Sequence, residues 1–138
     1  MTNNFHLRPG MVLYCDFSTG FQPPEIIKKR PVVILSPRSQ LCIVIPLSTT
    51  IPMQVKSYHH QLERSSLPSI LCKKGEVWAK CDMIYTVSLA RLDRVKNGHD
   101  KNGKTLYTSH FVTKNDFECI KKAVLAALGF NDLTRYIT

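Results

Sequence analysis

Lys28-Lys29-Arg30-Pro31-Val32-Val33-Ile34-Leu35-Ser36-Pro37 is the stretch that decides the fold of this chain. Four β-branched or aliphatic residues follow Pro31 directly, and such residues favour strands. The residue before a proline is also biased away from the helical region. The stretch therefore predicts a buried strand over residues 31–36, which begins immediately after the guanidinium of Arg30.

A second strand is predicted over residues 41–47, after a short link at 37–40. It runs into a cluster of hydroxyls at Ser48, Thr49 and Thr50. Two neighbouring strands can place Arg30 beside these hydroxyls at one end of a sheet. Because arginine offers a rigid fork of donors that stays charged, this arrangement suits a phosphate group.

The remaining elements are predicted from periodicity and turn residues. We expect strands at 11–17, 56–63 and 76–83, a long loop at 18–29, a short helical turn at 88–92, and a hairpin that pairs 93–97 with 104–108. Apolar residues at helical spacing predict a helix over 114–128, with Thr113 as its N-cap and Gly129 after its end. Segment 130–138 receives no assignment. Residues 1–138 are expected to form a single β-rich α+β domain, a small antiparallel barrel capped by a helix.

Charge and cysteine content bound the functional class. Nineteen basic residues against ten acidic ones give a net charge of +9, which favours a polyanionic partner. The five cysteines are scattered without zinc-ligand spacing, so we expect reduced thiols in a cytoplasmic protein and neither a metal nor another cofactor. No apolar run approaches the length of a membrane helix, and no secretory signal precedes the first strand.

Several motifs, in order, give the chain a resemblance to the MazF/PemK toxins of bacterial toxin–antitoxin systems. The segments that carry it are Arg8–Phe17, Lys29–Val33, Ile45–Thr49, Lys80–Asp82 and the apolar helix before Gly129. The resemblance implies an SH3-like barrel with a C-terminal helix, usually as a homodimer. It also implies an endoribonuclease that cuts single-stranded RNA without a metal and is inhibited by a cognate acidic antitoxin.

The resemblance also assigns candidate catalytic residues. Arg30 matches the catalytic arginine of relatives, and Ser48 stands where they carry a threonine beside it. Thr49 would take that role if the register slips by one residue. Because they are two residues apart, Asp82 and Lys80 are expected on one face of the 76–83 strand, either as base and acid or as a plain ion pair. Some relatives carry arginine where this chain has Lys80.

RNA-binding candidates lie mainly in the long loop. They are Phe21 as a base-stacking ring, Glu25 as a weaker base candidate, and Lys28 and Lys29 as phosphate contacts. Tyr58 and Tyr85 are further stacking candidates, for which packing is the competing interpretation. The adjacent His59 and His60 would face opposite ways in a strand, and we expect them to be surface residues.

Two alternative functions come from other classes. Toxins resembling CcdB share the expected fold but bind DNA gyrase and cut nothing. A barrel that binds nucleic acid without catalysis would also explain the charge. The pairing of Arg30 with a hydroxyl cluster favours the nuclease over both.

Overall fold

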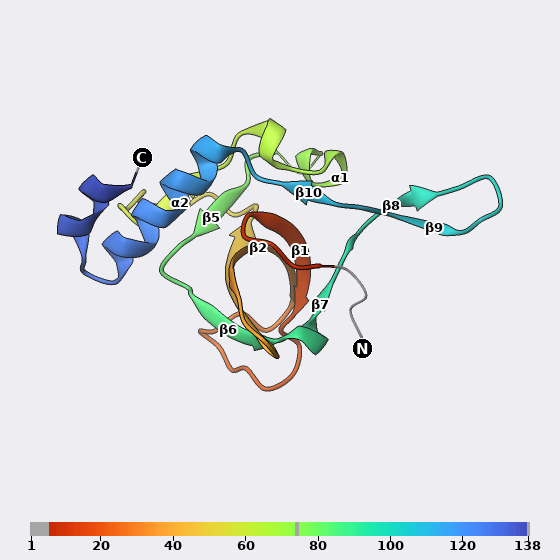
Figure 1. The fold of residues 1–138 in the computed structure, drawn as a ribbon, viewed down its shortest axis with the longest axis horizontal. Coiled ribbons are helices and arrows are strands. Elements are labelled where there is room, and N and C mark those ends of the chain that lie inside the picture. The colour runs from red at the N-terminus through yellow and green to blue at the C-terminus, as the bar shows by residue number, and fades with distance from the viewer. Residues whose placement is uncertain (1–5, 74, 138) are drawn as a thin grey trace.

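The computed structural model describes residues 6–73 and 75–137, and most of its strands form one curled, mostly antiparallel sheet with the shape of a half-barrel (Figure 1). The order along this sheet is β10-β1-β2-β3-β5-β4, with β6 also paired to β3 and β7 to β1. The strands are β1 (Met11–Asp16), β2 (Lys29–Pro37), β3 (Leu41–Ser48), β4 (His59–Gln61), β5 (Trp78–Lys80), β6 (Tyr85–Ser88), β7 (Leu92–Asp93), β8 (Val95–His99), β9 (Thr105–Thr108) and β10 (His110–Phe111). The helices are η1 (Arg64–Ser66), α1 (Ser69–Cys72), η2 (Leu89–Arg91), α2 (Lys114–Ala127) and η3 (Asn131–Tyr136).

The deciding stretch forms the central strand β2, which pairs with β1 on one side and with β3 on the other. Its apolar run is continuous because both faces of the sheet are covered. Val33 and Ile45 belong to one buried cluster, whereas Val32 and Ile34 belong to a second cluster on the opposite face. A register shift between Ile34 and Ser36 interrupts the pairing with β3, and bulges of this kind increase the bend of a sheet.

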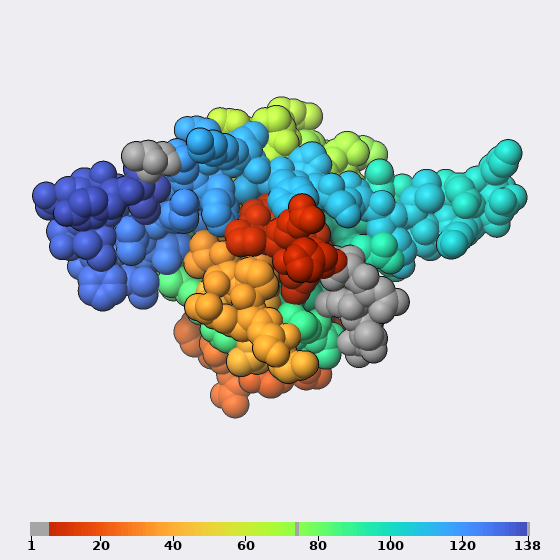
Figure 2. Space-filling model, viewed as in Figure 1, coloured from red at the N-terminus to blue at the C-terminus, as the bar shows by residue number. Residues whose placement is uncertain are grey.

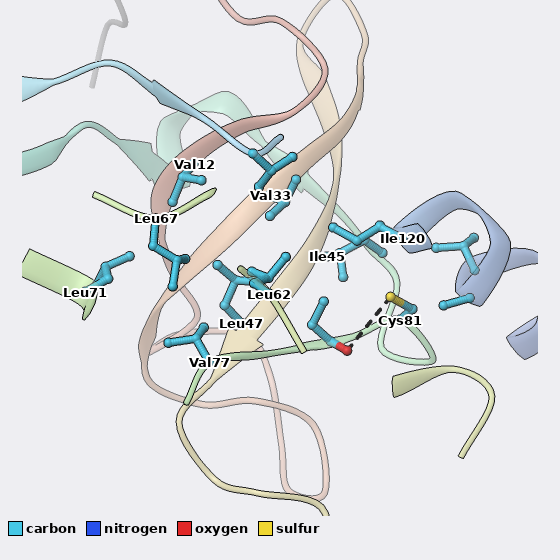
Figure 3. Packing of buried hydrophobic residues seen from close by; sticks show 14 of the residues in the cluster. Val12, Val33, Ile45, Leu47, Leu62, Leu67, Leu71, Val77, Cys81 and Ile120 are labelled. Atoms are coloured by element: carbon cyan, nitrogen blue, oxygen red, sulfur yellow. Dashed lines mark hydrogen bonds between the residues drawn. The ribbon is translucent and has the colours of Figure 1, made fainter. Parts of the chain in front are cut away.

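Helix α2 covers the face that carries Val33 and Ile45, as Figure 3 shows for Ile120. The predicted N-cap is confirmed, because the hydroxyl of Thr113 accepts a hydrogen bond from the Asp116 amide at 3.1 Å. Gly129 follows the helix with a φ of +84°, a conformation that side chains disfavour. The local signals of the sequence therefore set both ends of this helix.

Two predicted strands and one unassigned segment differ from the expectation. The strand expected at 76–83 is only β5, because the Met83 amide bonds to the Lys80 carbonyl at 3.0 Å and closes a turn there. The strand expected at 56–63 is only β4, the edge strand of the sheet. The segment 130–138, left unassigned, contains the 3₁₀ helix η3.

The predicted hairpin is confirmed as β8 and β9, which form a separate two-stranded sheet. It projects from the half-barrel in both the ribbon and the space-filling views (Figures 1 and 2). The short helical turn expected at 88–92 is also confirmed, as η2. None of the helices in the described segments is long and apolar enough to cross a membrane.

Candidate active site

Two pockets lie on opposite sides of the point where β3 ends. The larger, of about 220 Å³, is lined by residues that include Arg30, Ser48 and Lys80. The smaller, of about 90 Å³, is lined by residues that include Lys29 and Thr49, and it also touches Arg30 and Ser48. Lys80 therefore lines only the larger pocket and Thr49 only the smaller one, whereas Arg30 and Ser48 line both.

Strand register explains why Ser48 and Lys80 share the larger pocket. Ser48 is paired with Trp78, and directly opposed residues in an antiparallel sheet project from the same face. Lys80 lies two residues beyond Trp78 in β5, so it projects from that face as well. The hydroxyl of Ser48 and the ammonium of Lys80 thus point to the same side of the sheet.

Arg30 reaches this face from β2. Val32 is paired with Pro46, and the same register continued by two residues aligns Arg30 with Ser48. Both residues line both pockets, and both side chains are half-buried. The structure therefore brings together a rigid guanidinium, a hydroxyl and a flexible ammonium around one opening.

The side chain of Ser48 is held by a local hydrogen bond. The amide of Thr50 donates to its Oγ at 3.1 Å, a turn that serine forms readily. Serine lacks the β-branch that restricts χ1 in threonine, and this bond supplies a restriction of its own. Because Oγ accepts from Thr50, its proton remains available to donate to a bound oxyanion.

Lys29 and Thr49 belong to the smaller pocket on the other face. The ammonium of Lys29 lies 5.6 Å from the centre of the Tyr14 ring. Burial raises the pKa of the Tyr14 phenol, so this hydroxyl stays protonated at neutral pH. Lys28 is exposed and is not among the residues that line either pocket.

The long loop borders the larger pocket through Pro24 and Ile26. An aromatic contact anchors this loop, with the ring centre of Phe21 5.5 Å from that of Tyr85. The hydroxyl of Tyr85 accepts a hydrogen bond from the Ile26 amide at 3.0 Å. Phe21 also lies under the Arg91 guanidinium, at 4.8 Å. The structure thus uses Phe21 and Tyr85 to position the loop, and neither lines the two pockets.

Glu25 lies in the same loop with an exposed side chain. Its carboxylate accepts a hydrogen bond from the Gln22 amide at 2.9 Å, which stabilises a turn of the loop. Although Pro24 and Ile26 line the larger pocket, Glu25 is not among the lining residues. The structure therefore brings the neighbours of Glu25 to the site, but not Glu25 itself.

Asp82 and Lys80 do not share a strand face as expected, because β5 ends at Lys80. Alternation of side chains applies only along an extended strand, and Asp82 lies in the turn that follows. Asp82 is exposed and, like Glu25, is not among the residues that line the larger pocket, although its chain neighbours Lys80 and Met83 are. Its charge also adds to burial in raising the pKa of the Cys81 thiol to about 12.

His59 is the residue near this face that sequence analysis assigned to the surface. It is paired with Lys80 across β4 and β5, so it projects from the same face as Ser48. The Lys56 amide donates to its Nδ1 at 3.0 Å, which leaves the proton of the neutral ring on Nε2. Because adjacent side chains in a strand face opposite ways, the sequence indicated that one of the two histidines could project from this face. Only the strand register identifies that histidine as His59.

His60 faces the other way and has a structural partner. Its Nε2 lies 2.7 Å from a carboxylate oxygen of Asp116, which is 1% exposed. Asp116 also accepts hydrogen bonds from the Glu63 amide and the Ser66 hydroxyl. This network joins the N-terminus of α2 to β4 and η1.

Residues 6–73 and 75–137 contain no group of three or more His, Cys, Asp or Glu side chains arranged to hold a metal ion. The larger pocket instead presents nitrogen and hydroxyl donors. Such donors can bind an anion and stabilise negative charge that develops on it.

Comparisons with known proteins agree with this fold. A MazF structure from Deinococcus radiodurans superposes with a TM-score of 0.62 at 12% identity, covering 91% of this chain and 99% of that one. A mycobacterial endoribonuclease solved in complex with its cognate antitoxin gives 0.58 at 20% identity, covering 90% and 96%. The chain therefore has the fold of the MazF toxins.

The family follows from the sequence comparison. The model of the PemK-like, MazF-like toxins of type II toxin–antitoxin systems matches residues 8–108. The Escherichia coli (strain K12) protein YifN is 30% identical over 116 residues, covering 70% of this chain and 78% of that protein. This chain belongs to the PemK-like, MazF-like toxin family.

Proposed function

We propose that this chain is an endoribonuclease toxin that cleaves single-stranded RNA by attack of the substrate's own 2′-OH on the adjacent phosphorus. The observation that carries the proposal is the convergence of Arg30, Ser48 and Lys80 on one pocket. The reaction needs a base for the 2′-OH, an acid for the leaving 5′ oxygen, and donors for the phosphorane. It requires no metal, because the nucleophile belongs to the RNA.

Each role is assigned to a group near the larger pocket. Arg30 and the hydroxyl of Ser48 donate to the phosphorane oxygens, where negative charge develops. Asp82 takes the 2′-OH proton, and the ammonium of Lys80 supplies a proton to the 5′ oxygen as that bond breaks. The products are a 2′,3′-cyclic phosphate and a 5′-OH. His59 donates from Nε2 to the bound RNA as a positioning residue.

The role of Asp82 is tested by the pH dependence of cleavage. Asp82→Asn should slow single-turnover cleavage roughly 10²–10⁴-fold, the cost of losing a general base, and should alter the acidic limb of the pH–rate profile. His59→Gln should instead raise the apparent RNA dissociation constant while the shape of the profile is kept. A near wild-type rate and profile in Asp82→Asn would contradict the assignment.

The overall proposal is tested with a long unstructured RNA in the presence of excess EDTA. Wild type should cleave it, and the fragments should carry 5′-OH ends. Complete loss of cleavage that Mg²⁺ or Mn²⁺ restores would contradict the metal-free mechanism. Binding of the RNA without cleavage under all conditions would favour a non-catalytic barrel.

We also propose an acidic antitoxin as the cytoplasmic partner of a homodimeric toxin. The net charge of +9 and the cationic lining of the larger pocket favour an acidic segment as the inhibitor. The mycobacterial neighbour was solved in complex with its cognate antitoxin. An inhibitor that covers the pocket should compete with RNA, so simultaneous binding without mutual weakening would contradict occlusion.

A further inference from the structure

The β8–β9 hairpin takes no part in the site described above. It projects away from the half-barrel as a narrow ribbon (Figures 1 and 2). Within β8 only Val95 is buried, and Lys96 to His99 are all exposed. Because the hairpin contributes so little to the core, it adds little to the stability of the fold.

Positive charge dominates this ribbon. It carries three lysines, Lys96, Lys101 and Lys104, against the single carboxylate of Asp100. That carboxylate accepts hydrogen bonds from the amides of Asn102 and Lys104, each at 2.9 Å, and so belongs to the turn. Among the described residues, no carboxylate forms an ion pair with any of the three lysines.

An aromatic contact lies near the base of the ribbon. The guanidinium of Arg94 lies 4.2 Å from the centre of the Tyr107 ring, and that ring is still 39% exposed. Stacked arginine and aromatic groups are surfaces on which single-stranded bases pack in a sequence-tolerant way. The ribbon therefore combines flexible cations with one stacking surface.

Strand register relates the base of the hairpin to the candidate active site through β1. Leu92 and Arg30 are both paired with Cys15, from opposite sides of β1. Strands are spaced by about 4.8 Å, so these two backbones lie roughly 10 Å apart. The hairpin begins three residues after Leu92. Because β7 runs antiparallel to β1, with Asp93 paired to Tyr14, these residues carry the chain about 10 Å away from the level of Arg30, and the five residues of β8 extend about 17 Å further.

We propose that the β8–β9 hairpin is an RNA-binding arm that contacts phosphates of the substrate away from the scissile one. This rests on the proposed function of the neighbouring pocket. Lysine is depleted in protein–protein interfaces, whereas lysine contacts with phosphates dominate non-specific nucleic-acid affinity. The exposed lysines of the arm thus fit a polyanion better than a second protein. Long substrates gain affinity from the arm, and short substrates do not reach it.

The test compares two variants with the same loss of charge. In the arm variant, Lys96, Lys101 and Lys104 are each replaced by Gln. In the control variant, Lys114, Lys121 and Lys122 on α2 are each replaced by Gln. Fluorescence anisotropy measures binding of two labelled 2′-O-methyl oligouridines, a long one of about 30 nucleotides and a short one of about six. Both lack the 2′-OH and cannot be cleaved.

Counterion release gives the expected size of the effect. Each phosphate contact adds about 0.7 to the slope of log affinity against log salt for a single strand, so the arm variant should lose about 2. Between 50 and 200 mM salt, the affinity advantage of wild type over the arm variant should therefore shrink roughly 20-fold. The control variant should lose a smaller part of the slope, and the short oligouridine should bind all three proteins alike.

Three outcomes decide the proposal. Equal binding of the long oligouridine by the arm and control variants would overturn it. A changed oligomeric state or weaker antitoxin binding, with RNA affinity unchanged, would also overturn it and make the arm a protein contact. If wild type cleaves no RNA yet the arm variant alone loses salt slope, the arm proposal holds and the proposed nuclease function fails.

Discussion

Ser48 lines both pockets and Thr49 lines only the smaller one, so comparing their replacements tests whether the larger pocket is the seat of chemistry. The hydroxyl of Ser48 lies on the face shared with Lys80, whereas Thr49, the next residue, lines the smaller pocket. If the larger pocket holds the phosphorane, Ser48→Ala removes one donor from the transition state. Thr49→Val removes a hydroxyl from the other face and should change the rate less than about threefold.

The structure sets the size of the effect. Loss of one transition-state donor typically costs about 10²–10³ in rate, or about 2.7–4 kcal/mol. Ser48 is half-buried and Arg30 remains beside it, so we expect the lower end, roughly 100-fold. The Thr50 amide released by the substitution is exposed and can bind water, so the free energy of unfolding should change by less than about 0.5 kcal/mol.

Single-turnover cleavage of a short RNA, with enzyme in excess, measures the chemical step. Ser48→Thr keeps the hydroxyl and is the matched control, so it should retain most of the rate. Urea unfolding of each variant separates a loss of chemistry from a loss of fold. An inactive Thr49→Val beside an active Ser48→Ala would refute both the register and the assignment of the larger pocket.

Three further predictions follow from other contacts. Arg30→Ala should slow cleavage roughly 100–1000-fold with an unchanged urea midpoint. Arg30→Lys should restore only part of the rate, because lysine lacks the bidentate fork. Rates within tenfold of wild type in both variants would refute the role of Arg30 as a transition-state donor. Asp116→Ala should lower the free energy of unfolding by about 1–3 kcal/mol, since its three partners lose their acceptor, and an unchanged urea midpoint would contradict this. At pH 8 iodoacetamide should modify Cys72 and Cys119 before the three buried cysteines, and mass spectrometry checks the order. The reason is that burial raises the pKa of the thiols of Cys15, Cys42 and Cys81 to about 12, 11 and 12 respectively.

Local signals predicted the parts of this fold that depend on neighbouring residues. Thr113 caps α2 as expected because the cap contact spans only three residues of chain. Arg30 precedes the apolar run as expected, although β2 begins one residue earlier, at Lys29, so Arg30 belongs to the strand. The strand extends to residues before Pro31 because Arg30 pairs with Cys15 on β1. The sequence alone does not show which residues of the two segments pair.

The rest of the site depends on which strand lies beside which. The alternation of His59 and His60 was visible in the sequence, but their roles follow from pairing with β5, some twenty residues further along the chain. Likewise, the apolar residues of 76–83 favour a strand throughout, yet the chain turns after Lys80 to continue toward β6. Propensity gives the preference of each residue and does not encode where tertiary pairing ends a strand.

The strand faces also bear on the two positions, Ser48 and Lys80, where this chain differs from the residues that the resemblance implies. Serine at position 48 loses the stiffness of threonine, but the hydrogen bond from the Thr50 amide restores an orientation for its oxygen. Lys80 loses the bidentate fork of arginine, and nothing comparable on the same strand replaces it. His59, paired with Lys80, adds a fixed N–H donor from the next strand. The same face thus carries several groups that can donate to a phosphate. Arg30 is the one rigid cation among the residues that line the larger pocket, so under the proposed mechanism the geometry of that guanidinium should govern the rate.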